Sequence, residues 1–499
     1  SVLSAIEGLK IATPRFEPYL VPIAIAILIG LFTVQKHGAH KVGKIFGPIM
    51  LVWFAALTAV GLAAIMRHLE VLYALDPRYG ARFMLHNGME GFLALSAVVL
   101  AVTGTEALYA DIGHFGASPV RLAWSTLVFP ALLFNYLGQG AILLEDPAAV
   151  RNPFYGLLPQ WGLYPMVALA TAATIIASQA VITGAFSLTR QAVHFDYSPR
   201  LEIRHTSPDE LGQVYVPAVN WAMMAGTIGL VVAFRSSQHL AAAYGVAVTT
   251  TMVITSCIYC FVARDLWRWR PLAIGGLAVL FLAVDAAFFG SSMTKIPHGG
   301  WFPLILAASI YYLMSTWRRG REALAEEIRA EILPLDQFFD AIEQHPPARV
   351  QGTALYMSRN PDGVPPALSR NIKHNKVLHE RTLLVTFTTV EAPRVPADRR
   401  LDVQPLGHGL YRVVVRHGFM ESPDMRSVFS LLNQRGMEVN PADVTIFVGT
   451  ERVAPASRRF DTCLFSLMAR NAQKATDFFR LPPDRVIELG AQVELPLHH

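Results

Sequence analysis

The stretch from Ala101 to Gly116 reads AVTGTEALYADIGHFG, and it follows an almost wholly apolar run from residue 92 to residue 102. It places Glu106 and Asp111 in a segment of membrane character. A carboxylate at membrane depth costs about 2.5–3.5 kcal/mol on insertion scales, so such groups persist mainly where they line a polar cavity or hold an ion. A helix opens most easily at a Thr-Gly-Thr step such as residues 103–105, and the opened turn frees backbone carbonyl groups as cation ligands. The stretch therefore predicts a broken transmembrane helix with an ion site at the break. The alternative is a buried glutamate that pairs with a neighbouring helix for structural reasons alone.

The composition is that of a membrane protein. Of the 499 residues, 53% are hydrophobic and 16% are charged, whereas soluble domains carry about 25% charged residues. The net charge is +5, but the Lys and Arg residues are scattered between apolar runs, which argues against a nucleic-acid partner. Cys257 and Cys260 form a CxxC inside an apolar run without a partner pair. Neither a metal site nor a disulfide framework is expected.

Nine apolar runs qualify as membrane spans, which take about 20 residues each. They cover residues 19–33, 45–66, 92–114, 123–144, 163–193, 216–234, 239–262, 271–289 and 301–317. The first ten residues resemble the tail of a helix, so we expect the supplied chain to begin partway through the protein. Lys and Arg are more frequent in the loops on one side of the membrane than in those on the other, and the richer side includes residues 318–321. This bias predicts a cytoplasmic C-terminal part.

The character of the chain changes after Trp317. Residues 318–346 predict a charged, amphipathic connector. Strand-like runs follow as GTALYMS, TLLVTFTTV, LYRVVVRHG and DVTIFVGT, with helical stretches at 423–435 and 460–471. Ser422 is the predicted N-cap of the first of these helices, with Pro423 at its first position. Residues 347–499 therefore predict a soluble α/β domain, after a transmembrane domain of residues 1–317.

The soluble part carries one histidine pair of interest. His374 and His379 lie in IKHNKVLHER, but the spacing lacks a third ligand, and a solvated helix start is the preferred interpretation over a metal site. Neither a phosphate-binding glycine loop nor a GxSxG motif occurs in the sequence. An enzyme is therefore not expected.

Several polar residues lie at membrane depth. Ser178, Gln179 and Thr183 fall in the run 163–193. Thr174 and Ser178 are four residues apart, as are Gln179 and Thr183, so the two members of each pair lie on the same face of the helix. Small hydroxyl residues are also ordinary contacts between packed membrane helices. Tyr244 lies near one end of its span, where an interfacial position is the alternative.

Two other predicted spans also carry polar or acidic residues. Asn135, Tyr136 and Gln139 form a polar cluster on another span, and Asp285 lies in the middle of the run 271–289. Asp285 is the third acidic candidate inside the membrane, after Glu106 and Asp111.

Several motifs resemble one known family over essentially the whole chain. They are TGTEALYADIGHFG, SPVRLAW, NYLGQGA, ASQAVITGAFSLTRQAV, HTSPDELGQVYVPAVNW, LAAAYGVAVT, GTALYMS and HNKVLHER. Together they resemble the Kup/HAK/KT potassium uptake family. The resemblance implies a LeuT-type core of the amino acid–polyamine–organocation superfamily, with two inverted repeats and twelve helices. The nine spans then correspond to helices four to twelve, so helices one and two and most of helix three are absent from this chain.

The resemblance also implies roles for particular residues. Thr103 is expected to bind potassium at the break, Glu106 to bind the ion or couple it to protons, and Tyr244 to line or gate the path. Further pathway candidates are Tyr109, Asp111, Ser178, Gln179 and Thr183. The expected activity is potassium–proton symport across the bacterial inner membrane, with no cofactor beyond the transported ions. For the cytoplasmic domain, the hypothesis is a regulatory role or formation of a homodimer.

Rival classes differ in what they require. An amino-acid or polyamine transporter of the same core would more often have a glycine-rich unwound segment without the acidic residue. A membrane enzyme needs a nucleophile–base or metal constellation, and a channel needs a selectivity-filter repeat; the sequence contains neither pattern. A receptor-like binding module has no positive support in the sequence.

Overall fold

The chain divides into two compact units. A computed structural model describes residues 1–37, 40–104, 112, 116–205, 214–330, 332–358, 360–390, 392, 394–418, 421, 423–455 and 460–495. The first unit comprises Ser1–Phe186 and Gln213–Ile310, and the second comprises Ser187–Gly212 and Tyr311–His499.

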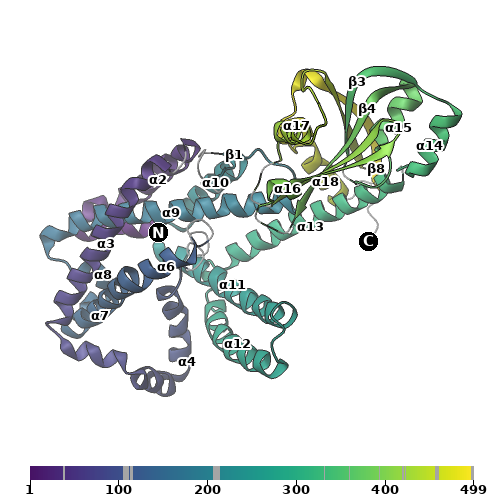
Figure 1. Ribbon diagram of the computed structural model, residues 1–499. Coiled ribbons are helices and arrows are strands. Elements are labelled where there is room, and N and C mark those ends of the chain that lie inside the picture. The colour runs from purple at the N-terminus through teal and green to yellow at the C-terminus, as the bar shows by residue number, and fades with distance from the viewer. Residues whose placement is uncertain are drawn as a thin grey trace. The chain divides into compact units, whose positions relative to one another are not determined.

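The first unit is helical (Figure 1). Its elements are α1 (Val2–Ala12), η1 (Pro14–Tyr19), α2 (Leu20–Val34), η2 (Gln35–His37), α3 (His40–Ile65), η3 (Leu69–Leu75), α4 (Pro77–Ala101), α6 (Ala117–Ala123), η4 (Trp124–Val128), α7 (Phe129–Glu145), η5 (Pro147–Arg151), α8 (Pro153–Gly156), η6 (Gln160–Gly162), α9 (Leu163–His194), β2 (Val214–Tyr215), α10 (Pro217–Phe234), α11 (Ser237–Asp265), α12 (Pro271–Met293), η7 (Ile296–His298) and the start of α13 (Trp301–Ala330).

Eight of the nine predicted spans overlap helical segments that are long and apolar enough to cross a membrane. The predicted span 92–114 overlaps its segment only over residues 92–101, because α4 ends at Ala101, and most of its remainder lies outside the described residues. Within the described residues these segments are Arg15–Val34, Ile45–Ile65, Pro77–Ala101, Ala117–Glu145, Gln160–His194, Pro217–Phe234, Ser237–Asp265 and Pro271–Met293. The ninth prediction, residues 301–317, falls on α13, which is not among them. The apolar part of α13 is short and carries several Tyr, Ser and Trp residues before the charged residues begin at Arg318.

Close helix packing in this unit depends on glycine. Helices α3 and α7 lie side by side (Figure 1). A Cβ on Gly138 of α7 would lie 2.6 Å from the Cα of Gly61 in α3, far inside van der Waals contact. Small residues allow such backbone approach, which is the usual basis of helix association in membranes.

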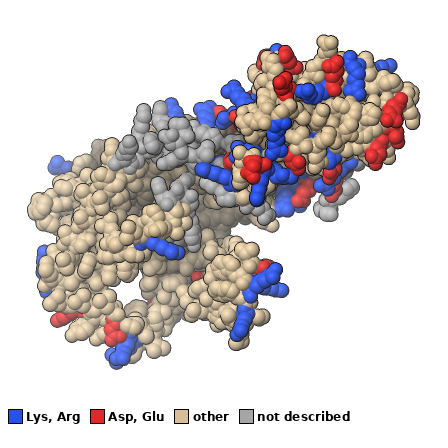
Figure 2. Space-filling view, viewed as in Figure 1, with Lys and Arg blue, Asp and Glu red and all other residues tan. Residues whose placement is uncertain are grey.

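The division between the two compact units lies within α13, and the domain boundary predicted at Trp317 stays a prediction. Helix α13 continues unbroken through that position, and its second half packs on the second unit, where the Trp317 and Phe465 ring centroids are 5.3 Å apart. The division therefore falls at Ile310, and the end of α9 from Ser187 onward also belongs to the second unit. Figure 2 shows that Lys, Arg, Asp and Glu are sparse on the visible face of the helical unit and dense over the second unit.

The second unit contains a six-stranded sheet of order β5-β6-β4-β3-β7-β8, parallel except for the β5–β6 pair. Its elements after α13 are α14 (Leu335–Gln344), β3 (Ala348–Ser358), α15 (Pro366–Asn375), β4 (Val377–Val390), α16 (Ala397–Arg400), β5 (Leu401–Gly407), β6 (Leu410–Gly418), α17 (Met425–Gln434), β7 (Val444–Pro455), α18 (Phe460–Arg470), α19 (Ala475–Phe478), η8 (Pro483–Arg485) and β8 (Val486–Leu495), and β1 (Arg204–His205) precedes them. The predicted α/β character and all four predicted strands are confirmed.

Successive side chains of the central strands pack in two different hydrophobic cores, one on each face of the sheet. Leu355 of β3 packs in one core with Val428 of α17, whereas its neighbours Ala354 and Tyr356 pack in another with Leu368 of α15. Successive side chains of a strand point to opposite faces, and parallel sheets are normally buried on both sides.

Two local predictions in this unit are wrong. The N-cap of α17 is Asp424, whose carboxylate accepts a hydrogen bond from the Arg426 amide at 3.2 Å; the predicted cap Ser422 lies outside the described residues. The stretch with His374 and His379 is the end of α15 and the start of β4, not a helix start. The β-branched and apolar residues that follow His379 extend the strand, and this outweighs the helix-like spacing of the charges.

Candidate functional site

The predicted helix break begins where α4 ends. Helix α4 stops at Ala101, the Val102 amide donates to the Val99 carbonyl at 3.2 Å, and Gly104 has φ of +110°. The Thr103 hydroxyl turns back to donate to the Leu100 carbonyl at 2.8 Å. Since glycine adopts positive φ without the penalty of a Cβ, the Thr-Gly step ends the helix where the sequence predicted.

The end of α4 leaves its last carbonyl groups without partners in the helix, and a tyrosine bonds to one of them. The Tyr136 hydroxyl of α7 donates to the Ala101 carbonyl at 2.9 Å. The last four carbonyl groups of a helix have no partner within it, so they accept from side chains, water or ligands. The sequence indicated only a polar cluster around Tyr136. It did not predict the hydrogen bond from Tyr136 to the end of α4.

Polar groups of α12 and the loop after it also bond to α4 carbonyl groups. The Ser291 hydroxyl donates to the Leu93 carbonyl at 3.2 Å, and the Lys295 ammonium donates to the Ser96 carbonyl at 3.1 Å. Burial lowers the pKa of the Lys295 ammonium from its usual range. The sequence pattern did not single out either residue, because neither lies within a predicted span.

Helix α11 passes beside the end of α4. A Cβ on Gly245 would lie 3.6 Å from the Leu100 side chain, and the adjacent Tyr244 is 38% exposed. One turn later, the fully buried Thr249 donates to the Gly245 carbonyl at 2.8 Å. The elements that carry Thr103 and Tyr244 are therefore neighbours.

The three pathway candidates on α9 bond elsewhere. Ser178 donates to the Thr174 carbonyl at 2.7 Å, and Thr183 donates to the Gln179 carbonyl at 2.9 Å, so each predicted i,i+4 pair lies together. The Gln179 amide bonds to the amide of Gln35. These bonds fit the helix-packing alternative that the sequence left open.

Of the three acidic residues predicted to lie within the membrane, the structure describes only Asp285. Glu106, Tyr109 and Asp111 lie outside the described residues. Asp285 is 5% exposed within α12, and the Ser256 hydroxyl of α11 donates to its carboxylate at 2.5 Å.

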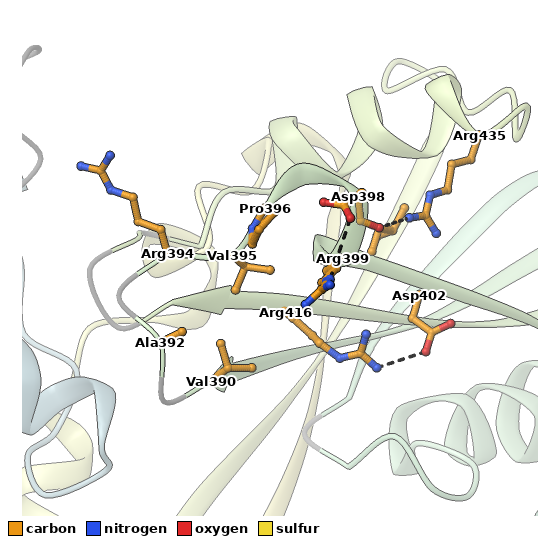
Figure 3. Close-up of a pocket in the computed structure, with 11 residues that line it drawn as sticks. Val390, Ala392, Arg394, Val395, Pro396, Asp398, Arg399, Asp402, Arg416 and Arg435 are labelled. Carbon is orange, nitrogen blue, oxygen red and sulfur yellow. Dashed lines mark hydrogen bonds and ion pairs between the residues drawn. The ribbon is translucent and has the colours of Figure 1, made fainter.

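The second unit carries a surface pocket of about 580 Å³ between Val390 and the β5–β6 edge (Figure 3). Arg416 pairs with Asp402 at 3.2 Å, and Arg435 donates to the Asp398 carbonyl at 2.8 Å. Figure 3 shows Arg394 extended away from these pairs. Within the described part of the chain, no group of three or more His, Cys, Asp or Glu side chains could hold a metal ion.

Comparison with known proteins gives consistent matches to potassium transporters. Residues 1–322 match the family described as K+ potassium transporter integral membrane domain, and residues 351–495 match the K+ potassium transporter C-terminal domain. Similar proteins include the "Probable potassium transport system protein Kup" of Myxococcus xanthus, 50% identical, and that of Azoarcus sp., 51% identical. The alignments cover 99% of this chain and 76% and 78% of those relatives. A protein of Geobacter sulfurreducens named "Probable potassium transport system protein Kup 1" is 51% identical over 99% of this chain and 79% of its own length.

Proposed function

Since this chain belongs to the K+ potassium transporter family, we propose that it takes up potassium across the bacterial cytoplasmic membrane by symport with protons. It is a multi-pass membrane protein. The proposed core is a LeuT-type inverted repeat in which one helix bundle rocks against the other around a site near the midplane. In this proposal the transported ions take the place of a cofactor, and the C-terminal domain lies in the cytoplasm.

The end of α4 is the observation that carries this proposal. Potassium is large and weakly hydrated, and it binds well to several neutral oxygens such as carbonyl and hydroxyl groups. The Thr103 hydroxyl and the freed carbonyls of Leu100 and Ala101 are oxygens of this kind, and they lie beside a glycine with positive φ. The C-terminal end of a helix also carries a partial negative charge, which favours a cation.

Glu106 supplies the proposed proton coupling. It follows Gly104 by two residues, and desolvation in a cavity of low dielectric favours the protonated form of a carboxyl group. In this symport scheme the carboxyl group takes up a proton from the outside while potassium is bound, and both ions leave together on the cytoplasmic side. In the proposal, Tyr244 lines the same path, and Tyr109 and Asp111 extend it.

Replacement of Glu106 tests this proposal. Expressed from its full coding sequence in a strain deficient in potassium uptake, the Glu106→Gln variant should lose proton-coupled rubidium uptake at low external potassium. Glu90→Gln, an exposed carboxylate on α4, should transport like the parent protein. Unchanged uptake by Glu106→Gln at equal expression would refute the assignment.

For the C-terminal domain, we propose a regulatory or dimerising role. Helices α9 and α13 both run without interruption from the first unit into the second, so each joins the membrane part to the α/β domain by continuous backbone. Removal of residues 352–499 should change the transport rate, its regulation or the oligomer size measured by light scattering. A truncated protein that matches the parent in all three would contradict this role.

A further inference from the structure

Among the residues that the structure describes, Lys295 has no acidic partner. It follows α12, and its ammonium group donates to the backbone carbonyl of Ser96, a residue that is 4% exposed. No described carboxylate lies within ion-pair distance of Lys295, in contrast to Lys10, which pairs with Glu17. A backbone oxygen of α4 is therefore the partner that the structure provides for this charge.

The Ser96 carbonyl belongs to a row of oxygens on one side of α4. The Leu93 carbonyl accepts from the hydroxyls of Ser96 at 2.8 Å and Ser291 at 3.2 Å, and the Leu100 carbonyl accepts from Thr103 at 2.8 Å. Residues 93, 96 and 100 have the i, i+3, i+7 spacing of one helix face. This α4 carbonyl row, defined as the carbonyls of Leu93, Ser96 and Leu100, leads to the break beside Gly104.

The donors along the row differ in charge. Hydroxyl groups bond to its two ends, whereas the middle carbonyl bonds to a full positive charge. Carbonyl oxygens bind both an ammonium group and a potassium ion. The ammonium of Lys295 thus occupies a position that a monovalent cation could otherwise take.

We propose that Lys295 is a specificity-determining residue whose ammonium group fills a cation position on the α4 carbonyl row and excludes a second potassium ion from it. The proposal rests on the proposed function only in assuming that potassium reaches the break of α4. Like charges at close range repel strongly where water is scarce. Lys295 therefore limits the path to the ion held at the break.

Equilibrium binding of radioactive rubidium to the purified full-length protein tests this assignment. Lys295→Met keeps the length and apolar stem of the side chain but removes the charge, so it should bind one rubidium ion more than the parent protein. Lys295→Arg should bind the same number as the parent. The matched control is Lys36→Met at an exposed lysine, which should also leave the number unchanged.

Rubidium uptake provides a second readout. Lys295→Met should lower the KM for rubidium several-fold and make uptake cooperative in rubidium, while Lys295→Arg keeps the KM of the parent. A merely structural role for Lys295 would lower the amount of active protein without changing KM or stoichiometry. A Lys295→Met protein with the parent stoichiometry and KM overturns the proposal.

A chemical variant covers the case in which Lys295→Met does not fold. Lys295→Cys, in a background where Cys257, Cys260 and Cys463 are replaced by Ser, is modified with either an aminoethyl or an uncharged ethyl disulfide reagent. The uncharged adduct should bind one rubidium ion more than the aminoethyl adduct, and equal numbers overturn the proposal. If the parent protein binds no rubidium, the proposed function fails, but the difference between the adducts still decides the role of Lys295.

Discussion

The side-chain amides of Gln35 and Gln179 exchange two hydrogen bonds, from Gln35 Nε2 to Gln179 Oε1 at 2.6 Å and from Gln179 Nε2 to Gln35 Oε1 at 2.9 Å. Gln35 is 5% exposed, and the pair joins η2 to α9. Each amide therefore satisfies the other in a place where water has little access. This pairing explains a polar residue at membrane depth on α9 without assigning it to an ion path.

The glutamine pair predicts an asymmetry between single and double variants. Gln179→Leu leaves the buried Gln35 amide without its partner and should destabilise the protein by about 1–3 kcal/mol. Gln35→Leu combined with Gln179→Leu removes both polar groups and should recover most of that loss. Thermal unfolding in detergent measures both effects. Additive losses in the double variant would show that the two amides are not coupled.

Gly104 offers a test of the helix break by conformation alone. A Cβ at this position meets no described atom within 4 Å, so Gly104→Ala should act only through the positive φ, at a cost of about 1–3 kcal/mol. Rubidium uptake and the unfolding temperature should both fall. Gly226→Ala is the matched control, because Gly226 lies in α10 with equally open surroundings, and there alanine should stabilise by about 0.5–1 kcal/mol. A Gly104→Ala protein as stable and active as the parent would argue against the break.

Arg200, in the segment after α9, contacts residues at the end of the α/β domain within the second unit. Its guanidinium carbon lies 5.1 Å and 5.2 Å from the ring centroids of Phe478 and Phe479, and its carbonyl accepts from the Gln473 amide at 2.7 Å. Cation–π contacts contribute about 0.5–2 kcal/mol. Arg200→Gln should therefore speed hydrogen exchange around Phe478 and Phe479 in the full-length protein. Arg485→Gln serves as the control and should not affect that region.

His417 makes the stability of the α/β domain depend on pH. Burial lowers the pKa of His417, whose Nε2 lies 3.1 Å from the Thr389 hydroxyl, and burial also lowers the pKa of His379. In the unfolded chain a histidine takes up a proton at about pH 6.5, whereas the buried folded form stays neutral to lower pH. Stability should thus fall as the pH drops below about 6.5 and level off below the folded pKa values.

Hydrogen exchange of β6 as a function of pH, corrected for intrinsic rates, measures this loss in the full-length protein. His417→Gln keeps a hydrogen-bonding side chain without the titration and should reduce the dependence on pH without abolishing it. His374→Gln, at an exposed position, should leave the profile unchanged. An unaltered profile in His417→Gln would contradict the role of burial.

Much of the fold could be predicted from local pattern. Apolar runs of membrane length correspond to eight observed helical segments, and runs of β-branched residues correspond to β3, β4, β6 and β7. Strands β5 and β8 were missed. They lie at the two edges of the sheet, where Pro405 and Gly490 interrupt the strand-like pattern.

The sequence by itself determined that this is a membrane protein of the potassium transporter type, with a helix that ends at a Thr-Gly step and an α/β domain after it. Those features depend on hydrophobic periodicity and on the backbone freedom of glycine, which act over a few neighbouring residues. Only the tertiary structure decided which side chains bond to the carbonyls of α4, because Tyr136 and Lys295 lie 35 and 199 positions from their partners. Contacts between such distant residues arise from the packing of whole helices, and no local pattern encodes them.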